Sequence, residues 1–214
     1  MPRSVPLLWP GACARERMAP ILCAAPPARC AAAAVTATPW STDMEQSDLF
    51  IDAFGRLPEA VRRATHGLDA RALNHRPYPQ GNSISWLIWH LARSEDAQIA
   101  PLAGHEQAWT AEGWYGRVGL PLAVEDTGYG HDSDQVAAVQ VQSADVLLGY
   151  YEAVHSRTAA FVSGVSGQDL DQVVDTAWDP PVTLGVRLVS ILGDGLEHAG
   201  QAAYLRGMSV AAGL

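Results

Sequence analysis

Apolar residues recur every three to four positions in several segments of this chain, and this spacing restricts it to a helical fold. The pattern predicts long helices over about residues 46–66, 83–102, 143–165 and 184–206, with a shorter helical stretch near residue 133. Valine-rich pieces such as residues 171–178 suit short strands, but none repeats often enough to build a sheet. The expected fold class is therefore all-α, with long helices that pack as a bundle.

Polar and small residues mark the ends of these predicted helices. Asn82 or Ser83 is a suitable N-cap for the second helix, and Thr183 for the last. Gly207 is expected to end the last helix, since glycine readily adopts the left-handed conformation of a C-terminal stop.

The chain divides into an N-terminal extension, residues 1–43, and a folded domain, residues 44–214. The extension is rich in Ala and Pro and has no helical or strand periodicity, so we expect it to be disordered. Prolines and charges interrupt any continuous apolar stretch there, which disfavours a secretory signal. Met18 or Met44 is a candidate for an alternative translation start. All three cysteines lie in the extension, so the domain contains neither a disulfide nor a cysteine nucleophile.

Charge and hydropathy narrow the set of partners. The chain has fourteen arginines and no lysine, and the domain has ten arginines against twenty-one acidic residues, a formal charge of −11. Such a surface repels phosphate backbones and disfavours nucleic-acid binding. No stretch is long and apolar enough to predict a membrane span, and we expect a cytoplasmic protein.

Three potential metal ligands lie on two of the predicted helices. Asp194 and His198 are four residues apart and project side by side from one helix face, and His90 lies among apolar residues in the second helix. If these helices are neighbours, the three side chains converge as a two-histidine, one-carboxylate site with open coordination positions. The competing interpretation is a hydrogen-bonded core histidine, with Asp194 and Glu197 facing water.

Two motifs around these residues resemble those of a known superfamily. The stretch "NSISWLIWHLARSED", residues 82–96, and the stretch "LEHAGQAAYLRG", residues 196–207, resemble the DinB-like superfamily, in particular its actinobacterial branch of mycothiol-dependent transferases and maleylpyruvate isomerases. The resemblance covers about residues 48–208. It implies a four-helix bundle of DinB type with a long connection between helices 2 and 3, commonly a homodimer, and a divalent metal held by His90, His198 and residue 194.

Asp194 departs from the motif, which most often has histidine at this position. A carboxylate makes the site harder and more anionic, so zinc is expected, with nickel, iron and manganese as alternatives. The resemblance further implies a transferase or isomerase in which the metal activates a low-molecular-weight thiol, such as mycothiol, toward a small-molecule electrophile. The alternatives are a non-catalytic metal- or ligand-binding stress-response bundle and a metal-dependent hydrolase.

Other polar residues near these motifs have two interpretations each. Glu197 is a candidate catalytic proton acceptor, although a solvated carboxylate is the more common case. Ser94, Glu95 and Asp96 follow His90 by about one turn and suit either ligand orientation or, as we expect, an exposed pair beside Arg93.

The long connection over residues 104–132 is rich in glycine and aromatic residues, and a connection of this length is more often functional than idle. We expect it to cover the site, with Tyr129 and His131 at its mouth. Trp86, Trp89, Trp109 and Trp114 are expected in the core, at an interface or on a substrate wall. His155 is expected to pack or to face solvent, and the histidines expected on the surface are His66, His75 and His105.

Overall fold

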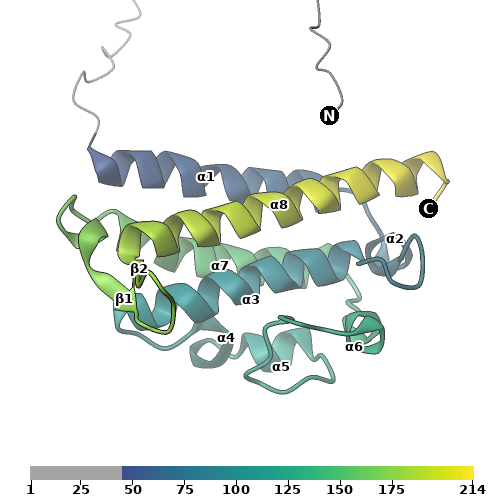
Figure 1. Ribbon diagram of the computed structural model, residues 1–214. Coiled ribbons are helices and arrows are strands. Elements are labelled where there is room, and N and C mark those ends of the chain that lie inside the picture. Colours follow the sequence, from purple (N-terminus) through teal and green to yellow (C-terminus); the bar gives the residue numbers. More distant parts are fainter. Residues whose placement is uncertain (1–44) are drawn as a thin grey trace, which may run out of the picture. The chain divides into compact units, whose positions relative to one another are not determined.

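The computed structural model describes residues 45–214, and four long helices form its framework (Figure 1). They are α1 (Gln46–Thr65), α3 (Ile84–Ala103), α7 (Ala144–Val162) and α8 (Leu184–Ala211). Helix α1 packs against α7 and α8, and α3 packs against the same two helices, which closes the bundle. The predicted all-α, four-helix bundle is confirmed.

The expectations for the N-terminal extension, its cysteines and its alternative start sites lie outside the described residues. Among residues 45–214, no helix combines the length and the apolar character that a bilayer crossing demands.

Side-chain caps begin two of the long helices where the sequence predicts them. The Ser83 hydroxyl accepts a hydrogen bond from the Trp86 amide at 3.1 Å, and the Thr183 hydroxyl accepts one from the Val186 amide at 3.4 Å. Both caps satisfy amide groups that the first helical turn leaves unpaired.

Helix α8 continues past Gly207, so the predicted stop there is wrong. Gly207 lies inside the helix, and the chain turns into the left-handed region only at Gly213, where φ is +74°. A glycine permits a helix end but does not impose one, and the interior glycine carries only its entropic cost.

The core lies between the four helices and continues under the connection that follows α3. Phe54 and Leu57 of α1, Leu87 of α3 and Leu188 of α8 are almost completely buried in it. Helix α3 is buried nearly all round, because α7, α8 and the connection cover different sides of it.

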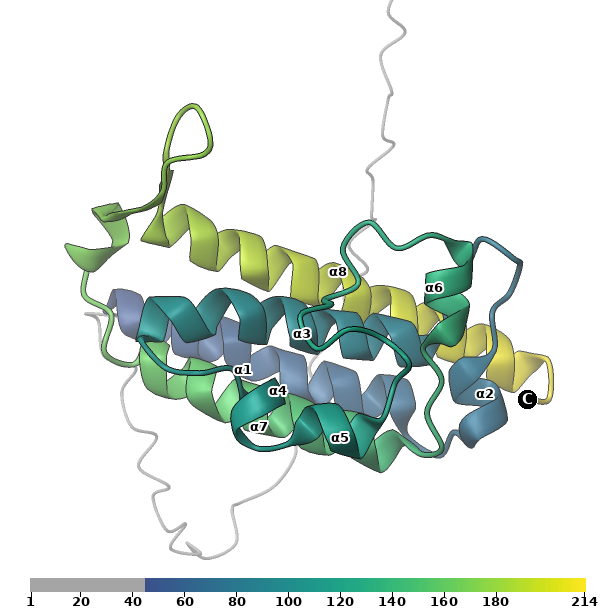
Figure 2. The ribbon, with the colours of Figure 1, turned by 90° about the horizontal axis from the view of Figure 1, so that it is seen from below.

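Short elements join the long helices. Helix α2 (Ala70–Asn74) precedes α3, and the connection between α3 and α7 contains α4 (Ala108–Ala111), α5 (Trp114–Val118) and α6 (Ser133–Ala138) (Figure 2). The 3₁₀ helix η1 (Asp169–Asp171) and the antiparallel strands β1 (Val173–Asp175) and β2 (Val182–Thr183) lie before α8. The long connection between the second and third bundle helices is thus confirmed, and the valine-rich segment supplies one strand of a two-stranded ladder.

The acidic residues that follow His90 are buried, which corrects the expectation of an exposed pair. Arg93 is completely buried, and Glu95 and Asp96 are each 2% exposed. Asp96 accepts hydrogen bonds from the Ala108 and Trp109 amides, both at 2.9 Å, so it caps the start of α4 from within the core.

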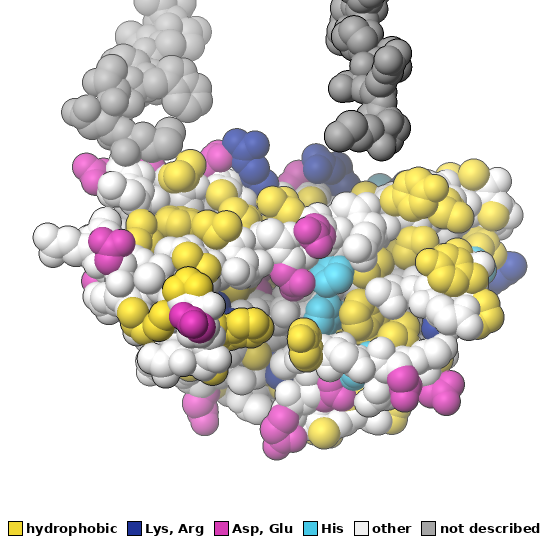
Figure 3. Space-filling view, viewed as in Figure 1, with side chains coloured by type: hydrophobic (Ala, Val, Ile, Leu, Met, Phe, Trp, Pro, Cys, Tyr) yellow, Lys and Arg dark blue, Asp and Glu magenta, His cyan; other side chains and the backbone are white. Residues whose placement is uncertain are grey.

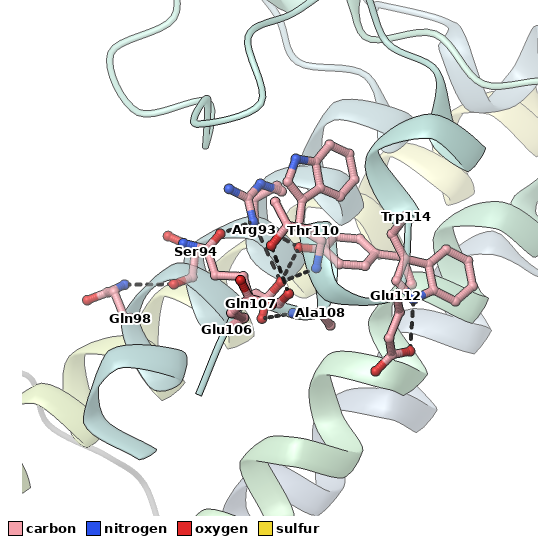
Figure 4. A network of polar contacts seen from close by, with 12 residues as sticks. Arg93, Ser94, Gln98, Glu106, Gln107, Ala108, Thr110, Glu112 and Trp114 are labelled. Atoms are coloured by element: carbon pink, nitrogen blue, oxygen red, sulfur yellow. Dashed lines mark hydrogen bonds and ion pairs between the residues drawn. The ribbon is translucent and has the colours of Figure 1, made fainter. Parts of the chain in front are cut away.

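Arg93 is the centre of a buried polar network that fastens the connection to α3 (Figure 4). Its guanidinium donates to Gln107 at 2.8 Å, to the Tyr150 hydroxyl at 3.1 Å and to the Asp126 carbonyl at 3.1 Å, and lies 3.6 Å from Asp96. A buried charge requires such partners, and in acquiring them Arg93 fixes the path of the chain over α3.

Candidate metal centre

His90, Asp194 and His198 come together where α3 packs against α8. One donor atom from each residue lies within 4.8 Å of the others, and the two imidazole centroids are 4.9 Å apart. Within residues 45–214 this is the one group of three or more potential metal ligands with such spacing. Figure 3 shows histidine side chains at the surface between the two helices.

His90 is held in a form that leaves one ring nitrogen free for a ligand. It is 6% exposed, and its Nδ1 lies 2.5 Å from the Thr127 carbonyl oxygen. A carbonyl can only accept, so Nδ1 must carry the proton and Nε2 keeps its lone pair. Burial lowers the pKa of His90, the nearby His198 adds to that effect, and the Thr127 carbonyl opposes it. The neutral imidazole that metal binding needs is therefore favoured.

Asp194 and His198 form a partly exposed pair along α8. His198 Nε2 lies 3.4 Å from Asp194 Oδ1, and this contact lowers the pKa of Asp194 and raises that of His198. At its other nitrogen, His198 Nδ1 lies 3.2 Å from Gln201 Oε1, which accepts a hydrogen bond there. The amide oxygen thus holds the proton on Nδ1 and leaves Nε2 directed toward Asp194.

The connection between α3 and α7 approaches His90 at Gly128. A Cβ atom at this position would lie 2.8 Å from His90 Nδ1 and 2.9 Å from the Trp89 ring, and φ is +89°. Both the close approach and the left-handed backbone require glycine here. The peptide before Gly128 supplies the Thr127 carbonyl that orients His90, so this loop is part of the site.

His131 and Trp86 support the same loop. His131 Nε2 lies 2.8 Å from Asp126 Oδ1, and its Nδ1 accepts a hydrogen bond from Trp86 Nε1 at 3.1 Å. The Trp86 ring stacks on His90 with centroids 4.6 Å apart. His131 therefore lies near the site with both ring nitrogens engaged, whereas Tyr129 is 93% exposed.

The other residues singled out from the sequence do not belong to the donor cluster. Glu197 is exposed on α8 and is not among the clustered donors, although its charge helps to raise the pKa of His198. Ser94 is close enough to Asp194 to help lower the pKa of that carboxyl. Trp89 and Trp109 are core residues, His155 is half-buried on α7, and the exposed histidines are His66, His75 and His105.

The donor set fits a divalent transition metal. Two imidazole nitrogens and one carboxylate oxygen match the ligand preferences of zinc, nickel, iron and manganese, and three protein ligands leave positions open for other molecules. The partial exposure of Asp194 and His198 gives those positions access to solvent.

A bundle of four helices with this donor set on its second and last long helices defines a DinB-like protein. A family model described as mycothiol-S-transferase matches residues 50–209, and the chain belongs to this family. The crystal structure of a conserved protein from Enterococcus faecalis is similar, with 30% identity and a TM-score of 0.74 over 79% of this chain and 99% of that one. A comparison with curated proteins found no match.

Proposed function

We propose that this protein is a divalent-metal-dependent S-transferase that joins a low-molecular-weight thiol, mycothiol or a close analogue, to a small electrophilic molecule. The observation that carries the proposal is the convergence of His90, Asp194 and His198 within 4.8 Å in a chain of the mycothiol-S-transferase family. The domain contains no cysteine, which fits a thiol brought in as a substrate.

His90, Asp194 and His198 would hold the ion, zinc in the first place, with nickel, iron or manganese as alternatives. When bound, the ion supplies Lewis acidity that lowers the pKa of a thiol, ordinarily near 8.5, so that the thiolate predominates at neutral pH. The carboxylate of Asp194 supplies one negative charge that offsets part of the charge on the cation.

The surrounding residues keep the two imidazoles ready for this role. The Thr127 carbonyl and the Gln201 amide oxygen each hold a proton on the Nδ1 atom of one histidine. Nε2 of His90 is then free to bind a metal, and Nε2 of His198 is directed toward Asp194. Trp86 stacks on His90 and restricts its rotation. Little rearrangement is then needed when the ligands are assembled.

The proton that the thiol loses needs an acceptor, and we propose Glu197 for this role. It lies on α8 one turn from Asp194 and is exposed, so it can exchange protons with water. On the same proposal the protein acts in the cytoplasm as a homodimer.

Elemental mass spectrometry of untagged protein tests the metal centre, with His90→Ala, Asp194→Ala and His198→Ala beside the wild type. We expect nearly one equivalent of metal in the wild type and little in each variant. Conjugation of mycothiol to 1-chloro-2,4-dinitrobenzene should then require the metal. Glu197→Gln should lower the rate of conjugation and leave the metal content of the protein unchanged.

The alternative functions predict different results in the same assays. Metal-bound protein that never accelerates conjugation would indicate a binding bundle, and saturable ester hydrolysis without added thiol would indicate a hydrolase. Metal-free protein whose variants are equally stable would contradict the proposed centre itself.

A further inference from the structure

A groove of about 560 Å³ lies between the C-terminal half of α8 and the loop of residues 77–82 that leads into α3. This volume is in the range of small-molecule sites. In Figure 3, hydrophobic side chains gather between the histidine side chains near the centre of the view and the C-terminal end of α8. The groove lies in this region.

The groove continues the candidate metal centre along one face of α8. Asp194, His198, Gln201, Leu205 and Met208 are spaced by four, three, four and three residues, so they form a row on this face. The last three line the groove, and Gln201 also accepts the hydrogen bond from His198. With a rise of 1.5 Å per residue, the row extends about 15 Å from His198 to Met208.

The lining of the groove combines aromatic, aliphatic and amide side chains and is uncharged. Tyr78 on the loop and Tyr204 on α8 are 61% and 72% exposed, so both rings are accessible to a ligand. Gln80, Asn82 and Gln201 add three amide groups, and the nine lining residues include no Asp, Glu or Arg. In a domain with twenty-one acidic residues, this is an uncharged surface beside a site that contains one carboxylate.

The loop wall of the groove is held in place before any ligand arrives. Arg76 donates to the carbonyls of Gly81 and Pro79 and to Ser133 at the start of α6. A Cβ atom at Gly81 would lie 3.2 Å from the Tyr78 ring, so this glycine lets the ring pack close to the backbone. A wall of this kind loses little entropy when a ligand binds.

Aromatic faces combined with amide groups and no charge are suited to a neutral polyhydroxylated ligand. The rings pack against the C–H faces of such a ligand, and the amides both donate to and accept from its hydroxyl groups. A peptide thiol with free carboxylates would find no cation in this lining, and an apolar ligand would leave the amides unsatisfied.

We propose that this groove selects the thiol substrate by binding a neutral polyhydroxylated portion of it against Tyr78, Tyr204 and Gln201, while the sulfur end reaches His90, Asp194 and His198. The inference rests on the proposed function for the identity of the substrate. It assigns to the groove a selective role separate from that of the metal ligands.

Calorimetric titration with S-methylmycothiol tests this proposal, because a methylated sulfur cannot react and binding is measured without catalysis. N-acetyl-S-methylcysteine amide carries the same sulfur end without the polyol and is the comparison ligand. We expect the wild type to bind S-methylmycothiol at least tenfold more tightly than this comparison ligand.

Tyr78→Ala and Tyr204→Ala should each weaken binding of S-methylmycothiol about tenfold, the scale of one lost aromatic contact. The control is Trp178→Ala, which removes an aromatic side chain that is 66% exposed and lies outside the groove, and it should not change the binding of S-methylmycothiol. Thermal unfolding checks that the variants fold.

Failure of the groove and failure of the proposed function are distinguishable. Wild-type protein that does not bind S-methylmycothiol, or tyrosine variants that bind it normally, would overturn the role of the groove even if the enzyme conjugates thiols. Binding that depends on both tyrosines in a protein with no transferase activity would support the groove and contradict the proposed function.

Discussion

Replacement of Glu95 by Gln should stabilise the protein at alkaline pH and leave its stability nearly unchanged in acid. Glu95 is 2% exposed, and the Tyr151 hydroxyl donates to its Oε2 at 3.3 Å, while Oε1 has no hydrogen-bond partner among the described residues. Burial raises the pKa of Glu95 to about 7 from an ordinary value of 4.5, and the hydroxyls of Thr158 and Tyr151 only partly oppose this effect.

The sign and size of the effect follow from linkage between protonation and folding. Between pH 4.5 and pH 7 the folded protein holds a proton on Glu95 that the unfolded chain has lost, so the free energy of unfolding falls as pH rises through this window. Above pH 7 the accumulated loss is about 3 kcal/mol, because each unit of pKa difference corresponds to about 1.4 kcal/mol. Gln keeps a similar shape and a hydrogen-bond acceptor but does not ionise.

Urea unfolding of the wild type and Glu95→Gln at pH 4, 6 and 8 measures this difference directly. The variant should be about as stable as the wild type at pH 4 and more stable by about 3 kcal/mol at pH 8. Taking the difference between the two proteins cancels the titration of all other groups. Glu59→Gln, on the exposed side of α1, serves as the control and should show no such trend. A difference between wild type and Glu95→Gln that does not change with pH would refute the reasoning.

Three further substitutions test other parts of the structure. Gly128→Ala should displace the loop from His90 Nδ1 and weaken metal binding at least tenfold, measured by competition with a chelator; unchanged affinity would contradict the role of this loop. Asp194→Asn should lower the pKa of His198 in metal-free protein, because the substitution removes the carboxylate that raises this pKa. NMR titration of the His198 imidazole measures the change, and an unchanged pKa would contradict the pairing of the two residues. Gly207→Ala should raise the free energy of unfolding by about 0.5–1 kcal/mol, since the position is helical with open space around it; destabilisation would argue for a helix end at this residue.

The long helices and the donor set could be predicted from the sequence because both depend on helical spacing. The 3.6-residue period places Asp194 and His198 side by side wherever the helix packs, and one neighbouring helix is enough to bring His90 to them. The resemblance supplied the information that spacing lacks, namely which helix is the neighbour.

The surroundings of the donors could not be predicted in this way. Helix α3 is covered on several sides, so its polar residues do not mark a solvent face, and Glu95 and Asp96 are buried where a surface helix would expose them. The group that orients His90 is the backbone carbonyl of Thr127, and a carbonyl has no signature in the sequence. The one available signal was Gly128 in a long connection, which marks a close backbone approach without naming its target.

Helix α8 is continuous from Asp194 through His198 to Met208, so it fixes the distances between the side chains along this face. A helix resists bending and compression, so the separation of positions along it is set by residue number and changes only in steps of 1.5 Å with a turn of about 100°. A single inserted residue after His198 would swing every later side chain of the row away from the face that bears Asp194. Substitutions can therefore adjust either end of this face separately, whereas an insertion or deletion between the ends would break their alignment.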